Sequence, residues 1–374
     1  MTNPTNDCYW MSHALRLAER GFYTARPNPR VGCVIVKDHQ LIAEGWHYRA
    51  GEAHAEAHAL RSAGDLARNA TAYVTLEPCS HTGKTGPCAH ALVTAGIARV
   101  VYAMQDPNPL VAGRGLQILR DAGIEVVGPV LEESARQLNS GFIKRMEKKL
   151  PYVRCKLAMS LDGRTAMADG KSQWITGAAA RSDVQQLRAQ SGAIVTGVDT
   201  LIQDDASFTL RESELHLKNA KDIVGLPPLR VLLDSKQRLA EDAKFFQIPS
   251  PILLVHALTD SVKKYPDWIE LISLPNEDQK IDLGKLLGLL ADRQINDLLV
   301  EAGPTLAGSF LSAGLIDELI IYMAPKLMGN LARPLFELPL KELNSAVDLQ
   351  IVDVRAVGKD WRIVARPLIK QTPP

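Results

Sequence analysis

The sequence predicts an α/β protein built from two domains. Segments with the period of buried strands alternate with segments of helical period, and the alternation begins again after Pro151. A length of 374 residues is long for a single core and sufficient for two domains of roughly 100–200 residues each. We therefore expect layers of helices on both sides of a sheet in the first part, a boundary between residues 149 and 150, and a second α/β domain over 150–374.

The first part opens with a helical pattern over residues 9–20, which Gly21 ends as a C-cap. The apolar run 31–36 predicts a buried strand, and residues 41–47 its hairpin partner. Glycine ends two of the following helical segments, and proline begins one of them. The remaining expected elements are a helix at 53–62, a strand at 72–76, a helix at 87–95, a strand at 98–103, a helix at 115–122, a strand at 125–127 and a helix at 134–149.

The second part begins with a strand at 152–159, because Pro151 ends the preceding helix. Residues 178–190 have a helical pattern, and we expect 212–228 and 266–279 to be surface excursions. The other expected strands lie near 193–197, 229–234, 251–256, 297–301 and 318–323.

The charge balance excludes some classes of function. The chain has 43 Lys and Arg against 42 Asp and Glu, so a protein whose main task is to grip nucleic acid or an anionic membrane is not expected. No apolar run approaches the roughly 18 residues of a membrane helix, and the polar start lacks the apolar core of a signal peptide. Five cysteines are few and odd in number, which favours a reducing compartment. We expect a soluble, cytoplasmic protein.

Metal-capable side chains are concentrated in the first part, which holds seven of the nine histidines and four of the five cysteines. His54, Cys79 and Cys88 are of the ligand types that zinc prefers, and each cysteine follows a proline near the end of an expected element. A catalytic zinc site keeps one position open for water. Glu56 would then be a proton carrier beside the metal rather than a ligand.

The same pattern leaves alternatives. His54 and His58 are four residues apart on an expected helix, so His58 could be a ligand, or both could be surface residues. Residues i and i+2 of a helix point to nearly opposite sides, so His54 and Glu56 share one site only if the metal lies over the helix tip. A closed, structural zinc module is a third possibility.

His-x-Glu followed by Pro-Cys and a second Cys resembles the zinc-dependent nucleobase deaminases, whose signature ends in Pro-Cys-x-x-Cys. This chain departs from that signature, because eight residues separate Cys79 from Cys88. The longer form is similar to the deaminases of the riboflavin pathway. Further segments that carry this resemblance are Pro27-Asn-Pro-Arg-Val-Gly32, Gly45-Trp-His47, Gly51-Glu-Ala-His-Ala-Glu56 and Asp106-Pro-Asn-Pro109.

The resemblance implies a cytidine-deaminase-like α/β/α sandwich as the first domain and roles for seven residues. It implies that His54, Cys79 and Cys88 bind zinc and that Glu56 is the general acid and base. It also implies substrate contacts at Asn28, His47 and Lys84. Asparagine offers a donor and an acceptor to a pyrimidinone edge, and a lysine can meet a phosphate as a point charge.

A second set of polar turns follows residue 150. Glycine-containing turns lie between expected strands and helices at 196–200 and 301–306, and such turns are ready anion sites. No Gly-x-Gly-x-x-Gly is present, so the Rossmann fingerprint is absent. From the residues alone, these turns could bind a nucleotide or could be ordinary connections between strands and helices that bind no ligand.

Residues 152–330 resemble the pyrimidine reductases of the same pathway, which implies a fold similar to dihydrofolate reductase and NADPH as cofactor. Ala302 stands where many relatives have a second glycine. The positions that resemble cofactor contacts are Ala158, Trp174, Thr200, Asp204, Ser235, Gly303, Pro304, Thr305, Leu306, Ala307, Gly308 and Ser309. The positions that resemble substrate contacts are Lys156, Ser172, Arg188, Phe208, Arg211 and Glu301.

These resemblances predict a bifunctional enzyme of riboflavin biosynthesis. It would deaminate 2,5-diamino-6-(5-phosphoribosylamino)pyrimidin-4-one and then use NADPH to reduce the ribosyl group to ribityl, with Asp204 and Glu301 as candidate proton donors. The alternative is a nucleic-acid-editing deaminase with an accessory domain, which the neutral charge disfavours. We expect a small phosphorylated substrate, no nucleic acid or membrane partner, and a homodimer formed through the apolar run 314–324.

Overall fold

The computed structural model describes all residues except 1–3, 81–85, 110, 260–262, 264 and 369–374. The chain divides into an N-terminal unit, Met1–Lys149, and a C-terminal unit, Leu150–Pro374, which are described separately. Both combine helices with β-sheets, so the predicted α/β class is confirmed. None of the helices in the described ranges is long and apolar enough to cross a membrane.

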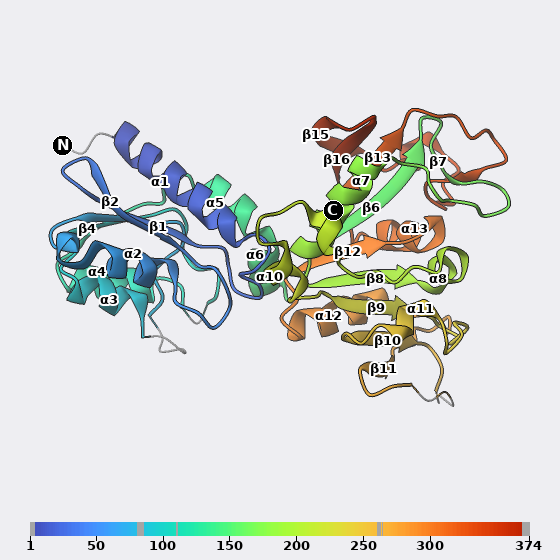
Figure 1. Cartoon of the computed structure of the whole chain (residues 1–374), viewed down its shortest axis with the longest axis horizontal. Helices are drawn as coiled ribbons and strands as arrows, with labels where there is room; N and C mark the ends of the chain where they lie inside the picture. Colours follow the sequence, from blue (N-terminus) through green and yellow to red (C-terminus); the bar gives the residue numbers. More distant parts are fainter. Residues whose placement is uncertain (1–3, 81–85, 110, 260–262, 264, 369–374) are drawn as a thin grey trace. The chain divides into compact units, whose positions relative to one another are not determined.

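The N-terminal unit is built on a five-stranded sheet with the order β2-β1-β3-β4-β5 (Figure 1). Strand β1 is antiparallel to β2 and β3, whereas β3, β4 and β5 run parallel to one another. The parallel strands therefore end at a common edge, where the segment that carries Cys79 leaves β3. The bounds are β1 Gly32–Lys37, β2 Gln40–Trp46, β3 Thr71–Val74, β4 Arg99–Tyr102 and β5 Glu125–Val127.

Helices cover both faces of this sheet because β1 is apolar on both sides. Cys33 and Ile35 pack into one core with helices α2, α3 and α4, whereas Val34 and Val36 pack into another with α1, α5 and α6. Gly32 permits close approach, since a Cβ there would lie 2.0 Å from the Ala14 carbonyl oxygen. The helices are α1 Pro4–Ala18, α2 Ala55–Ala63, α3 Cys88–Thr94, α4 Arg114–Asp121, α5 Glu132–Leu138 and α6 Ser140–Lys148.

The single helix predicted over 134–149 is in fact two helices, α5 and α6, which meet at Asn139. The Asn139 side chain is buried, accepts from the Arg30 backbone N–H over 2.8 Å and donates to the Arg30 carbonyl over 3.0 Å. A side chain that bonds a distant backbone segment in this way fixes a local geometry that the helical period does not reveal.

The C-terminal unit contains a nine-stranded sheet with the order β11-β10-β9-β8-β12-β6-β13-β16-β15. The strands from β11 to β13 are parallel, and β16 and β15 continue the sheet in antiparallel pairing. The bounds are β6 Tyr152–Ser160, β8 Ala193–Gly197, β9 Leu229–Leu233, β10 Ile252–His256, β11 Ile269–Ser273, β12 Asp297–Glu301, β13 Glu318–Ala324, β15 Leu349–Val357 and β16 Asp360–Pro367.

Two apolar cores cover the faces of this sheet. Helices α12 (Leu283–Asp292) and α13 (Pro304–Ser312) pack into one, and α7 (Ala178–Gln190), α8 (Val198–Asp204) and α11 (Lys244–Gln247) into the other. A two-stranded sheet, β7 (Arg164–Ala166) with β14 (Arg333–Pro334), lies outside the main sheet.

Three expectations for this unit are corrected. The segment 266–279 contains strand β11, and 212–228 contains two short helices, α9 (Glu212–Leu215) and α10 (Ala220–Val224), whose Leu215 and Ile223 are fully buried. The apolar run 314–324 does not offer a dimer surface, because β13 lies inside the sheet between β6 and β16. The run is apolar because a parallel interior strand is buried on both faces.

Candidate active sites

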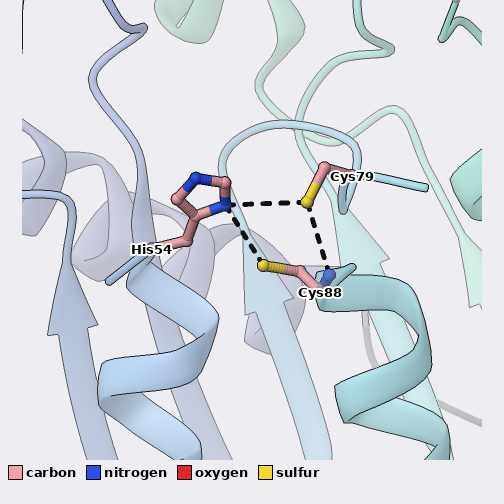
Figure 2. Close-up of side chains that lie close together, drawn as sticks. All are labelled: His54, Cys79 and Cys88. Carbon is pink, nitrogen blue, oxygen red and sulfur yellow. Dashed lines mark hydrogen bonds between the residues drawn. The ribbon is translucent and has the colours of Figure 1, made fainter. Parts of the chain in front are cut away.

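Three predicted ligands meet at the strand-end edge of the N-terminal sheet. His54 is the extended residue immediately before α2, Cys79 follows β3, and Cys88 is the first residue of α3. Figure 2 shows the two sulfur atoms and the His54 ring nitrogen turned toward a common point. Because His54 precedes the helix, its side chain and that of Glu56 can both reach the tip of α2.

The spacing of these three donors fits a tetrahedral zinc ion. His54 Nδ1 lies 3.3 Å from Cys88 Sγ and 3.6 Å from Cys79 Sγ. Zinc bonds of about 2.3 Å to sulfur and 2.0–2.1 Å to nitrogen at tetrahedral angles place such donors about 3.5 Å apart. Among the described residues this is the one group of three or more His, Cys, Asp and Glu side chains close enough to hold a metal ion. His58 is not a member of it.

The protein groups around this point favour ionisation of the Cys79 thiol, whereas the hydrogen bond with Cys79 and burial raise the pKa of the Cys88 thiol. The pKa of the Cys79 thiol is lowered to about 4, because its sulfur accepts hydrogen bonds from the Cys88 side chain, His54 and the Cys88 backbone N–H. Glu56 is only 3 % exposed, and this burial raises the pKa of its carboxyl group to about 7. A carboxyl group with a pKa near neutrality can both accept and donate a proton.

Two of the predicted substrate residues lie beside the three ligands. His47 and His54 meet edge to face with ring centroids 5.4 Å apart, and Asn28 Nδ2 lies 3.1 Å from His47 Nε2. His47 Nδ1 lies 3.2 Å from the Ala53 carbonyl oxygen, which fixes the ring. Burial lowers the pKa of His47, so the neutral ring is favoured. The third predicted contact, Lys84, lies outside the described residues.

The C-terminal unit has a cleft of about 1840 Å³ at the carboxyl ends of its parallel strands. All the predicted substrate contacts of this unit line it, from β6, α7, β12, the segment that precedes α7 and the segment that follows α8. The predicted cofactor contacts also line it, except Ala307 and Gly308. These two lie on the far side of α13, where Ala307 is in the apolar core and a Cβ at Gly308 would meet the Glu337 backbone.

Three charged side chains form a buried group in this cleft. Arg188 donates to both carboxylate oxygens of Glu301, over 2.6 and 3.0 Å. Burial lowers the pKa of the neighbouring Lys156, and the charge of Glu301 offsets part of that effect. Burial alone would raise the pKa of Glu301, but Arg188 and Lys156 together hold it below its ordinary value. Glu301 is therefore a carboxylate at neutral pH and a poor proton donor.

Polar and aromatic groups complete the cleft. Ser172 donates to Asp204 over 2.7 Å, and the guanidinium of Arg188 lies 4.9 Å from the centre of the Phe208 ring. Trp174 is 61 % exposed, and Arg181 lies 4.6 Å from the centre of its ring system. An exposed indole on the wall of a cleft is suited to stacking against a flat ligand.

Several functional candidates were not predicted from the sequence. Arg181 and five further basic residues line the cleft, and in the N-terminal unit the buried Glu77 contacts the segment around α4. Isolated basic residues are usually solvated, so a single Lys or Arg in the sequence does not indicate a binding site. Glu77 had a weak signal, since it directly precedes Pro78-Cys79. The five basic residues are Lys236, Arg238, Lys244, Lys280 and Arg333.

Two family models match the chain, one in each unit. Residues 4–104 match the cytidine and deoxycytidylate deaminase zinc-binding region, and residues 151–363 match the RibD C-terminal domain. The first match supports zinc in the N-terminal unit and a cytidine-deaminase-like fold there, as predicted. The second confirms a reductase unit after residue 150 and suggests a nicotinamide cofactor.

Curated relatives match over almost the whole chain. The riboflavin biosynthesis protein RibD of Escherichia coli is 50% identical over 363 residues, which are 95% of this chain and 97% of that protein. The protein of the same name from Haemophilus influenzae is 48% identical over 97% of this chain and 98% of its own.

Solved structures agree with these relatives. Acinetobacter baumannii RibD is 46% identical, with a TM-score of 0.89 over 98% of this chain and 100% of that one. A diaminohydroxyphosphoribosylaminopyrimidine deaminase/5-amino-6-(5-phosphoribosylamino)uracil reductase from Thermotoga maritima is 33% identical, with a TM-score of 0.86 over 98% of this chain and 99% of that one.

Proposed function

Because this chain belongs to the RibD family of bifunctional deaminase and reductase enzymes of riboflavin biosynthesis, we propose which compounds its two units act on. The N-terminal unit deaminates 2,5-diamino-6-(5-phosphoribosylamino)pyrimidin-4-one, and the C-terminal unit reduces the ribosyl group of the resulting uracil with NADPH. The observation that carries the proposal is the meeting of His54, Cys79 and Cys88 beside the buried Glu56. The alternative of a nucleic-acid-editing deaminase is not favoured.

For the deaminase unit we assign the roles residue by residue. His54, Cys79 and Cys88 hold zinc, which supplies Lewis acidity to a water molecule when it is bound. Glu56 would take a proton from that water, whose oxygen would form a bond to the ring carbon that carries the amino group, and would deliver the proton to that amino group, so that the C–N bond breaks and ammonia leaves. Asn28 pairs with the polar edge of the pyrimidinone ring, and His47 holds Asn28 in place through their 3.1 Å contact. Lys84 is assigned to the substrate phosphate.

For the reductase unit, bound NADPH would supply the hydride that reduces the substrate's ring-opened imine at C1′, and the imine nitrogen would gain a proton. The cleft lined by Trp174, Thr200, Ser235 and the start of α13 holds the cofactor. Lys156, Ser172, Arg188, Phe208 and Arg211 orient the phosphorylated substrate through charge-assisted hydrogen bonds and ring contacts. Between the two candidate proton donors, Asp204 is preferred, because Arg188 and Lys156 favour the ionised form of Glu301.

The proposal includes a homodimer formed through the edge strand β15. Its residues Leu349, Ile351, Val352 and Val354 are 40 %, 56 %, 46 % and 52 % exposed, and a long apolar edge strand is a template for pairing with a second copy. Light scattering after size exclusion should give the mass of a dimer, and Ile351→Lys should give the mass of a monomer.

We further propose a cytoplasmic enzyme, in line with its five free cysteines.

The experiment that tests the function is incubation with the diaminopyrimidinone substrate, with and without NADPH. Ammonia and the NADPH absorbance are followed together. We expect ammonia in both cases and NADPH oxidation only after ammonia release. NADPH oxidation without ammonia release, or neither reaction, would contradict the proposal.

A further inference from the structure

Glu77 is a buried residue whose carboxylate accepts hydrogen bonds from backbone N–H groups. In the chain, Glu77 lies between the end of β3 and the ligand Cys79, and it is 3 % exposed. Oε2 accepts from the N–H groups of Asp106 and Gly113 over 3.2 and 2.9 Å, and Oε1 accepts from Gly115 over 2.9 Å. Three amide donors satisfy a carboxylate that burial has removed from water.

Two of these bonds tie the start of helix α4 to the segment after β3 that carries Cys79. Gly113 is the residue before α4, and Gly115 lies in its first turn. The contact is close, because a Cβ added at Gly115 would lie 1.9 Å from the carbonyl oxygen of Pro78. The same carboxylate also fixes the turn that begins at Asp106, a segment for which the proposed reaction gives no role.

Cys79 is also fixed by the start of helix α3. The Ala89 N–H donates to the Cys79 carbonyl over 3.2 Å, and the Cys88 N–H donates to Cys79 Sγ over 3.3 Å. The dipeptide Pro78-Cys79 therefore contacts the start of α3 through Cys79 and the start of α4 through Pro78. Only the second contact depends on Glu77.

We propose that Glu77 is a positioning residue of the metal site, which sets the place of Cys79 by joining its strand end to α4. This inference rests on the proposed zinc site, and it assigns Glu77 no contact with zinc or substrate. A metal ligand loses affinity when the groups that orient it are removed, because the ligand then samples positions away from the metal.

The test is the rate at which the zinc-loaded full chain releases zinc to a chromogenic chelator. Glu77→Gln keeps the shape of the side chain, but its amide nitrogen cannot accept a hydrogen bond and must face at least one of the three N–H donors. We expect release to become roughly 10–100-fold faster, as for other residues that orient metal ligands. Gly115→Ala leaves the carboxylate unchanged but displaces α4 from Pro78, and we expect the same direction of effect.

Two control variants separate positioning from loss of stability. Leu119→Ala removes a fully buried side chain of α4 and destabilises the unit while it leaves the Glu77 bonds unchanged. Glu133→Gln makes the same chemical change as Glu77→Gln on the surface of α5. We expect both controls to release zinc within about twofold of the wild-type rate, at a temperature where circular dichroism shows them folded. Reduction of the deaminated substrate reports on the C-terminal unit and should be unchanged in every variant.

Each outcome bears on the proposal. Wild-type release rates in both Glu77→Gln and Gly115→Ala, or equal acceleration by Leu119→Ala, would overturn it. If Glu77→Gln does not fold, Gly115→Ala decides the question alone. A wild-type chain that binds no zinc would refute the proposed function instead, and the two failures are thereby distinguished.

Discussion

Arg188 and Glu301 face each other in a two-bond ion pair, with Nε to Oε1 at 2.6 Å and Nη2 to Oε2 at 3.0 Å. The pair joins α7 to the end of β12 inside the cleft of the C-terminal unit. The side chains are 12% and 7% exposed, so each charge depends on the other for solvation. Removal of either partner should therefore disturb the cleft.

Arg188→Ala should impair only the reductive step. It leaves the Glu301 carboxylate without its main partner and removes a cation assigned to the substrate, and we expect a loss of about 10²-fold in reductase kcat/KM. The rate of ammonia release should stay within about twofold of the wild-type rate. Arg293→Ala is the matched control, because Arg293 makes the same two-bond pair with Glu270 outside the cleft. Equal losses in the two variants would show that the effect is one of stability.

Removal of zinc should separate the two activities. Chelation takes the metal from His54, Cys79 and Cys88, so ammonia release should stop, whereas NADPH oxidation with the deaminated substrate should continue. Addition of zinc should restore ammonia release. The measurement is both rates before and after dialysis against a chelator, and loss of both activities on chelation would contradict two independent sites.

Glu56→Gln should abolish deamination without loss of the metal. The amide keeps the volume of the side chain but cannot carry the proton, and general acid–base groups contribute roughly 10²–10⁴-fold to rate. We expect a loss in that range together with wild-type zinc content by atomic absorption. Glu133→Gln is the surface control. Full deaminase turnover in Glu56→Gln would instead favour a structural zinc module.

The sequence predicted the chemistry of the deaminase site better than its geometry. Residue types and spacing identified His54, Cys79 and Cys88, but their approach depends on two helix starts and one strand end that are distant in the chain. The requirement that the metal lie over the tip of α2 follows from the helical period alone, and the position of His54 before the helix meets it.

Features that depend on long-range contacts could not be predicted. The break at Asn139 depends on hydrogen bonds to Arg30, which is 109 positions away. The resemblance predicts that Ala307 and Gly308 contact the cofactor together with their neighbours, whereas the helical period of α13 directs them into the core and toward Glu337. The burial of Glu77 likewise becomes evident only when α4 is in place.

Reductase activity should depend on pH through Lys156. Burial lowers the pKa of this lysine below its ordinary value, so its positive charge is lost at a lower pH than that of an exposed lysine. Because Lys156 is assigned to the anionic substrate, KM of the reductive step should rise on the alkaline side. Lys156→Arg keeps the positive charge over the neutral and alkaline range, so the alkaline rise in KM should disappear. An unchanged pH profile in the variant would assign the titration to another group.

The ion pair between Asp7 of α1 and Arg99 of β4 should contribute to the stability of the N-terminal unit. Its two bonds are 2.9 and 2.8 Å long, and Tyr73 donates a third hydrogen bond to Asp7 over 2.9 Å. Asp7→Asn leaves the Arg99 charge buried without its main partner, so we expect the free energy of unfolding to fall by about 3 kcal/mol at neutral pH. Hydrogen exchange of the α1 and β4 amides measures the free energy of unfolding of this unit. Asp121→Asn, on the surface of α4, is the control and should leave that free energy unchanged.

The same pair predicts how that stability changes with acid. The hydrogen bonds from Arg99 hold the pKa of Asp7 below its ordinary value, so the folded state binds its proton less readily than the unfolded chain. The contribution of the pair is therefore complete above the unfolded-state pKa of about 3.9 and is lost as the pH falls through the lower, folded-state value. The difference in unfolding free energy between wild type and Asp7→Asn should shrink over that acidic range and stay constant from pH 6 to 8. A difference that did not change with acid would mean that Asp7 acts through its shape and hydrogen bonds rather than through its charge.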